Sequence, residues 1–170
     1  YLAKVRAQLC QELAPAVAKH VGAISTRGEA TTLRYERSGG PDLAAALAAS
    51  AAEERRLRQT VVGPHRDDIA LELDGAAAAS FASEGQQRTL SLALRLAQAD
   101  VIRARRDAPP IYLLDDIFGE LDTERRRRLL TALPADSQRI LTSTAWDWLE
   151  EKDERLPRGW TIARGQILEA

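Results

Sequence analysis

The sequence predicts an α/β fold built around a parallel sheet, and three observations support this prediction. Residues 111–114 form a continuous apolar run, which is typical of a strand buried on both faces. Residues 120–133 have helical spacing, and residues 139–143 form a further apolar strand. Because a strand, a helix and a second strand in this order usually pair in parallel, residues 111–143 are expected to form a crossover unit.

The remaining elements follow from the spacing of apolar residues. Helices are expected where these residues recur every three or four positions: residues 1–21, 42–58 and 86–106. Strands are expected where apolar and polar residues alternate: residues 31–37, 69–73, 76–81, 160–163 and 167–169. Pro15 is expected to bend or interrupt the first helix, and Asp42 to cap the second. Asp74 and Gly75 mark the turn of a hairpin.

The composition excludes several classes of protein. Apolar residues make up 45% of the 170 positions, which suits a globular protein with a buried core. The net charge of -1 gives no electrostatic case for nucleic-acid binding by the whole chain. Cys10 is the only cysteine, so no internal disulfide forms and a reducing cytoplasm is expected. No apolar stretch approaches the ~20 residues that span a bilayer. The chain begins at Tyr1 and has no methionine, which favours a piece of a longer protein.

Asp115 and Asp116 follow the apolar run directly and are the first candidate site. Ligands of parallel sheets bind beyond the carboxyl ends of the strands, where these two side chains are expected. Magnesium takes one or two carboxylates together with water and phosphate oxygens. The first aspartate would hold the metal and the second would activate a water molecule. The alternative is a buried strand followed by a solvated loop.

Ser83, Gly85 and Gln86 are the second candidate site, at the start of the long helix. The first amide groups of a helix have no partner within it and attract anions. Gly85 would let a phosphate approach the backbone closely, and the Ser83 hydroxyl can donate to a phosphate oxygen. The alternative makes Ser83 a helix cap and Gly85 a turn residue.

Taken together, the motifs resemble the RecF family of ATP-binding-cassette ATPases. The resemblance rests on four runs: Gly-Pro-His-Arg-Asp-Asp at 63–68, Ser-Glu-Gly-Gln-Gln-Arg at 83–88, Leu-Leu-Asp-Asp at 113–116 and Gly-Glu-Leu-Asp at 119–122. It implies the C-terminal lobe of an ATPase head at residues 60–170, with part of a helical arm domain at residues 1–59. For the run at 63–68, the residues themselves favour a structural role, with Arg66 paired to Asp67 or Asp68.

The resemblance also implies roles for single residues. Ser83, Gly85 and Gln86 would contact the γ-phosphate of ATP held by the partner in an ATP-dependent homodimer. Asp115 would serve Mg²⁺, Asp116 would be the general base, and Asp122 would couple the two sites as part of the D-loop. Transport ATPases usually have a switch histidine after the next strand; here Thr142 and Thr144 are the candidates. The implied function is a slow, DNA-dependent ATPase of recombinational repair that promotes recombinase loading at gaps, with RecR and RecO as partners.

The phosphate-binding loop Gly-x-x-x-x-Gly-Lys-Ser/Thr is absent from these residues. We therefore expect this chain alone neither to bind ATP tightly nor to hydrolyse it. Two other functions remain open: the head of a chromosome-maintenance or transport ATPase, and a non-catalytic dimerisation module. The basic runs at 103–106 and 125–128 are expected to form solvated faces, with Glu120 and Glu124 as possible partners of the second. His20 is expected at a helix end, and His65 is expected to be hydrogen-bonded for structure.

Overall fold

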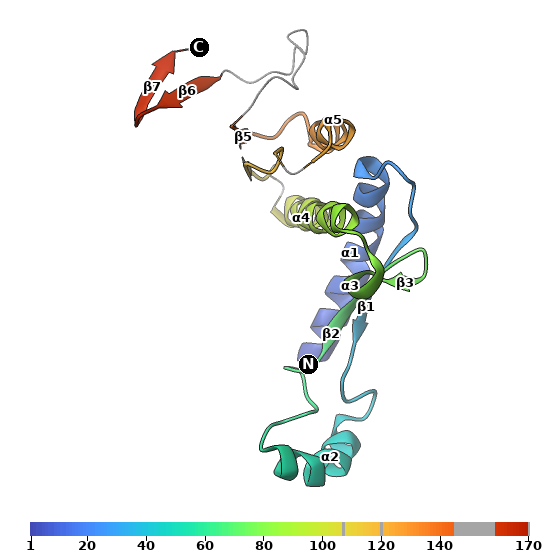
Figure 1. The fold of residues 1–170 in the computed structure, drawn as a ribbon. Coiled ribbons are helices and arrows are strands. Elements are labelled where there is room, and N and C mark those ends of the chain that lie inside the picture. The colour runs from blue at the N-terminus through green and yellow to red at the C-terminus, as the bar shows by residue number, and fades with distance from the viewer. Residues whose placement is uncertain (107, 120, 145–158, 170) are drawn as a thin grey trace.

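The computed structural model describes residues 1–106, 108–119, 121–144 and 159–169 and has the predicted mixed α/β architecture (Figure 1). Its helices are α1 (Leu2–Ile24), α2 (Leu43–Leu57), α3 (Ala78–Phe81), α4 (Glu84–Arg106) and α5 (Thr123–Ala132). Its strands are β1 (Thr31–Glu36), β2 (Asp68–Leu73), β3 (Ala76–Ala77), β4 (Tyr112–Asp115), β5 (Arg139–Thr142), β6 (Trp160–Ala163) and β7 (Gln166–Glu169). None of the described helices is long and apolar enough to cross a membrane. Glu120, the expected start of a helix, lies outside the described residues.

The two long helices α1 and α4 pack against each other and organise the molecule (Figure 1). Val17 and Val21 of α1 are fully buried in a core that also contains Leu90, Ala93 and Ala97 of α4. These positions recur every three or four residues, so they lie on one face of each helix. The alanines let the two helix backbones approach closely, and the packing fixes where α4 begins.

Pro15 lies inside α1, which continues to Ile24. Of the two expected effects of Pro15, interruption of the helix is therefore wrong, and a bend stays a prediction. Proline removes one backbone hydrogen bond and crowds the preceding turn. Buried side chains lie on both sides of it, at Cys10 before and at Val17 after, and both belong to the same core. Packing against α4 thus offsets the local cost.

Strands β1, β2 and β3 form an antiparallel sheet in that order. Thr31 pairs with Leu73 and Glu36 with Asp68, so the inward-facing Leu33 and Leu73 share one face and are buried. The expected return strand over residues 76–81 is wrong beyond Ala77, because residues 78–81 form the short helix α3. A run of alanines favours helix over strand, and Ala78 is buried in the core once the chain turns.

The crossover unit is confirmed, since β4 and β5 pair in parallel on either side of α5 in the chain. A second core lies beneath it, and Phe118 and Leu129 are fully buried there. The expectation that β4 is buried on both faces is wrong: Ile111 is 60% exposed and Leu113 72% exposed. Only β5 pairs with β4 among the described residues, and the face that carries these two side chains is uncovered.

Helix α2 lies at one end of the molecule, away from both cores (Figure 1). Asp42 caps it as predicted, accepting the backbone N–H of Ala45 at 3.1 Å. It contains no buried residue. At the opposite end, β6 and β7 form the predicted hairpin, with Ile162 paired to Ile167. One of the two cores contains residues of α1, β1 and α4.

Asp67 connects the segments that lead into and out of α2. Its carboxylate accepts hydrogen bonds from the hydroxyls of Tyr35 and Ser38 and lies 4.0 Å from the Arg6 guanidinium. The expected pairing of Arg66 with Asp67 or Asp68 is not what forms: the Nε of Arg66 donates to the carbonyl of Thr60 at 2.8 Å. The Asp67 carboxylate instead forms an ion pair with Arg6 of α1. These contacts support the structural role that the sequence favours for residues 63–68.

Hydrogen bonds make Asp67 a source of pH-dependent stability. The donors are Tyr35 first, then Ser38, and with nearby Arg6 they hold the pKa of Asp67 below its usual value. A carboxyl group whose pKa is lower in the folded protein than in the unfolded chain, where it is about 3.9, stabilises the fold at pH values above about 3.9. This stabilisation is lost as the pH falls through the pKa of the folded state. We expect Asp67→Asn to lower the melting temperature at pH 6, and the difference from wild type to narrow below about pH 4.

Asp68→Asn is the matched control, because Asp68 is the exposed neighbour. Melting curves of wild type and both variants between pH 6 and pH 2.5 check the prediction. An Asp67→Asn difference that stays constant down to pH 2.5 contradicts it.

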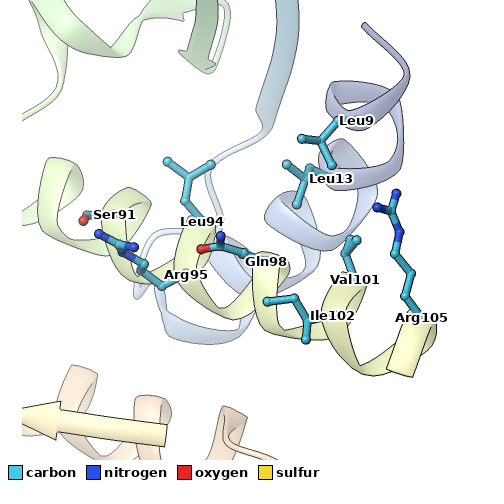
Figure 2. Close-up of a pocket in the computed structure, with 9 residues that line it drawn as sticks. All are labelled: Leu9, Leu13, Ser91, Leu94, Arg95, Gln98, Val101, Ile102 and Arg105. Carbon is cyan, nitrogen blue, oxygen red and sulfur yellow. The ribbon is translucent and has the colours of Figure 1, made fainter. Parts of the chain in front are cut away.

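His20 and Asp100 join α1 to α4. The His20 Nε2 lies 2.8 Å from Asp100 Oδ2, and the histidine lies near the end of α1, as predicted, where it is buried. An apolar groove runs between the same helices farther along, lined by Leu9, Leu13, Leu94, Val101 and Ile102 with Arg95 and Arg105 beside them (Figure 2). At this groove Arg105 forms an ion pair with Glu12 of α1 at 2.5 Å.

Candidate functional site

The start of α4 is held by a reciprocal pair of hydrogen bonds. The backbone N–H of Gln86 donates to the Ser83 hydroxyl at 3.3 Å, and the backbone N–H of Ser83 donates to the Gln86 side-chain oxygen at 2.7 Å. This is a capping box with glutamine at its third helical position. Ser83 is therefore a helix cap, and its hydroxyl proton remains available for a further acceptor.

Gln86 also contacts a residue that the sequence did not single out. Its side-chain nitrogen donates to Glu29 at 3.0 Å, and Ser25 donates to the other Glu29 oxygen. Burial tends to raise the pKa of Glu29, but the hydrogen bonds from Ser25 and Gln86 outweigh it and lower that pKa. The ionised Glu29 thus ties the start of α4 to the end of α1. Gln86 is 57 residues from Glu29 in the chain, whereas Ser25 is only 4 residues away. Only the contact with Gln86 therefore requires tertiary structure.

Gly85 lies in the first turn of α4 beside the guanidinium of Arg125. A Cβ atom at this position would lie 2.8 Å from the Arg125 Nη1, closer than such atoms approach each other. The residue has ordinary helical backbone angles, so no left-handed conformation demands glycine here. Because Gly85 has no side chain, there is room for the Arg125 guanidinium beside it. Gly85 is a helix residue rather than a turn residue.

Asp115, Asp116 and Thr142 meet at the carboxyl ends of β4 and β5. Parallel pairing places Asp115 opposite Thr142. The Thr142 hydroxyl donates to the Asp115 carboxylate and accepts the backbone N–H of Asp116 at 3.0 Å. Thr142, of the two threonine candidates, is the one in contact with the aspartates. Thr144 is exposed at the end of the described segment.

Asp116 adopts a left-handed backbone conformation, with φ of 47°. Few residues other than glycine do so readily, and aspartate and asparagine are among them. The backbone N–H of Asp116 is held by the carbonyl and the hydroxyl of Thr142, at 3.2 and 3.0 Å. The chain therefore turns sharply away from the strand and leaves the Asp116 side chain exposed.

The two exposed carboxylates suit a magnesium ion that also binds phosphate. Among the described residues there is no group of three or more His, Cys, Asp or Glu side chains that could enclose a metal. Magnesium needs no such group, because it keeps several waters and takes one or two carboxylates. Asp115, oriented by Thr142, fits this donor set.

Asp122 begins α5 and faces Arg125. Its carboxylate accepts the backbone N–H of Arg125 at 2.8 Å and lies 3.1 Å from the Arg125 Nη1. Arg125 thus touches both Gly85 and Asp122. The structure therefore brings the predicted residues together in two groups: Asp115 with Asp116 and Thr142, and the start of α4 with Asp122.

Other arginines of the two basic runs form ion pairs, and in α5 the partner is Glu124, one of the two that the sequence suggested. Arg127 and Arg128 form ion pairs with Glu124 of the same helix. Arg103 forms a two-pronged pair with Asp136. Arg125 departs from the expectation of a solvated face, since only 16% of its side chain is exposed.

Comparison with known proteins gives a consistent result. No protein-family model matches the chain. The DNA replication and repair protein RecF of a Synechococcus species is 40% identical over an alignment of 151 residues, which covers 82% of this chain and 40% of that protein. The RecF protein of a Synechocystis species is 34% identical over 96% of this chain and 45% of its own length.

Solved structures show the same likeness. The recombination mediator protein RecF with ATP, in the RecFOR pathway, superposes with a TM-score of 0.69 and 26% identity over 85% of this chain and 41% of that one. The chain belongs to the RecF family. Its fold is that of part of an ATP-binding-cassette head, as the sequence predicted. The chain spans less than half the length of these RecF proteins.

Proposed function

We propose that this chain is the part of a RecF-type, DNA-dependent ATPase that supplies the magnesium ligand, the general base and the surface that completes the partner's nucleotide site. The observation that carries the proposal is the contact of Thr142 with both aspartates at the end of β4. It pre-orients a carboxylate at the position where ligands of parallel sheets bind. Membership of the RecF family and the solved RecF structure with ATP support the choice of nucleotide.

Asp115 and Asp116 have different roles in this proposal. Asp115 would hold Mg²⁺, directly or through water, because Thr142 fixes its carboxylate. The ion would neutralise charge on the phosphates. Asp116 would accept the proton of the attacking water, and its exposed side chain leaves room for that water. An aspartate is shorter than the glutamate of many transport ATPases, which fits slow turnover used as a switch.

The start of α4 and Asp122 would act on the partner subunit's nucleotide in an ATP-dependent homodimer. Ser83 retains a hydroxyl proton to donate to the γ-phosphate, and Gln86 is fixed by Ser83 and Glu29. The free amide groups at the helix start favour an anion there. Asp122 would cross the interface as the D-loop residue.

The relatives in the RecF family support a proposal for the biological setting. We propose action in the cytoplasm in recombinational repair, with DNA, RecR and RecO as partners and recombinase loading at gaps as the outcome. Residues 1–59 would form the returning part of the helical arm, and residues 60–170 the C-terminal lobe of the head. The solved relative is described as a recombination mediator in the RecFOR pathway, which supports the choice of partners.

The test is ATP hydrolysis by a full-length protein that carries this chain, with and without double-stranded DNA. Turnover that DNA stimulates is the expected result. Turnover that is indifferent to DNA indicates another cassette ATPase instead. No turnover under either condition indicates a dimerisation module and overturns the proposal.

Thr142→Val removes the hydroxyl that orients Asp115 while keeping the side-chain volume. We expect the Mg²⁺ concentration for half-maximal ATP hydrolysis to rise about tenfold, because groups that orient a metal ligand typically contribute that much to affinity. Titration of Mg²⁺ at saturating ATP measures it. Thr131→Val is the control, since its hydroxyl bonds only the Arg127 carbonyl within α5. An unchanged Mg²⁺ dependence for Thr142→Val contradicts the assignment.

A further inference from the structure

Arg125 differs from the other arginines of its helix. Only 16% of its side chain is exposed, whereas Arg127 is 73% exposed and pairs with Glu124 in the same helix. The Arg125 Nε is buried and has no hydrogen-bond partner among the described residues. Its Nη1 lies 3.1 Å from Asp122 and against the backbone of Gly85. One guanidinium thus bridges the start of α5 and the start of α4.

Stability alone does not account for this placement. Burying a charged group and leaving one of its N–H groups without a partner both cost free energy. A cation at the beginning of α4 is also opposed by the positive end of the helix dipole. Asp122, its carboxylate partner in the described part of the chain, is half exposed, which weakens the pairing. The arrangement is therefore costly and needs a reason other than holding the fold together.

We propose that Arg125 is a positioning residue that fixes Asp122 against the beginning of α4, so that both move as one unit. This inference rests on the proposed function, in which Ser83, Gly85 and Asp122 serve the partner's nucleotide. Arg125 acts through these residues and does not itself touch the nucleotide. Gly85 then has a second purpose, because its missing side chain leaves the space that the guanidinium occupies.

The first test needs no nucleotide and measures the contact itself. Melting temperatures are compared for wild type, Gly85→Ala, Arg125→Ala and the double variant of the full-length protein. In a protein that keeps Arg125, the methyl group of Gly85→Ala displaces the guanidinium, and the melting temperature should fall by about 3 °C. In the Arg125→Ala background the space is free, and alanine is a better helix former than glycine. Gly85→Ala should then leave the melting temperature unchanged or raise it.

The second test separates positioning from general stability. Steady-state ATP hydrolysis is measured with DNA for Arg125→Ala, Arg125→Lys and the control Arg127→Ala, at a temperature where all are folded. Misplaced groups lower kcat, so Arg125→Ala should lower kcat about tenfold or more while KM for ATP changes less than about threefold. Lysine keeps the charge near Asp122 and should recover part of kcat. Arg127→Ala should match wild type.

The outcomes distinguish this inference from the proposed function. Absence of hydrolysis in wild type overturns the proposed function, and the melting temperatures still decide whether the contact exists. If the changes in melting temperature caused by Gly85→Ala and Arg125→Ala simply add in the double variant, the contact between Gly85 and Arg125 is overturned. Hydrolysis by Arg125→Ala equal to that of Arg127→Ala overturns the positioning role, as does a change confined to KM.

Discussion

Asp116→Asn should lower kcat for ATP hydrolysis by about 100-fold or more in a full-length protein that carries this chain, because general-base catalysis contributes roughly that much. Asparagine has nearly the same shape but accepts no proton. It also tolerates the left-handed backbone that φ of 47° imposes, so the turn after β4 is expected to persist. The loss can therefore be attributed to chemistry rather than to local misfolding.

Two further measurements make this prediction specific. ATP-dependent dimerisation, followed by light scattering, should survive in Asp116→Asn, since the residue acts after nucleotide binding. Asp136→Asn is the control: it also removes a carboxylate from the surface, but one that pairs with Arg103. Hydrolysis by Asp116→Asn within about threefold of the control would falsify the assignment of the base.

Phe118→Ala should lower the free energy of unfolding by about 3–5 kcal/mol, the usual range for removing a buried phenylalanine. The Phe118 side chain is fully buried in the core that also contains Ile24 and Leu129. It lies in the segment between Asp116 and Asp122, so the same side chain anchors both ends of the candidate site. This core also contains Leu96 of α4, so a cavity left by alanine lies where several elements meet.

Phe81→Ala provides a matched control, because these are the two phenylalanines of the chain and Phe81 is 76% exposed. Its effect should stay within about 0.5 kcal/mol. Denaturant unfolding of the full-length protein, monitored by circular dichroism, checks both. Equal effects of the two substitutions would show that Phe118 does not anchor this core.

Sequence patterns were sufficient where local chemistry decides the structure. The cap at Asp42 and the parallel pairing around α5 depend on spacing and on turn residues, and both are confirmed. Patterns failed where distant contacts decide. Pro15 stays helical because α4 packs against residues on both sides of it. Leu113 has the apolar character of a doubly buried residue, yet its side chain is exposed in the described part of the chain.

The candidate site shows the same division. Asp115 and Asp116 are recognisable from the run that precedes them, and Ser83 from the helix that follows. The residues that hold these side chains in place are not recognisable from the sequence. Glu29 reaches Gln86 across 57 residues, and Arg125 of α5 lies against Gly85 of α4 although β4 stands between these helices in the chain. A run of four arginines gives no indication that one side chain is only 16% exposed, because the space it occupies depends on a glycine elsewhere in the chain.

The excursion through α2 has a consequence for how such proteins can vary. The chain leaves the sheet at Glu36 and returns at Asp68, and these two residues pair with each other. Asp67 and Ser38 bind each other at the base, so the detour is closed there and not by α2 itself. Loop-closure entropy grows only with the logarithm of length, about 0.6 kcal/mol for each doubling. The segment between Glu36 and Asp68 can therefore differ widely in length among such proteins, with little effect on the stability of the sheet and the cores.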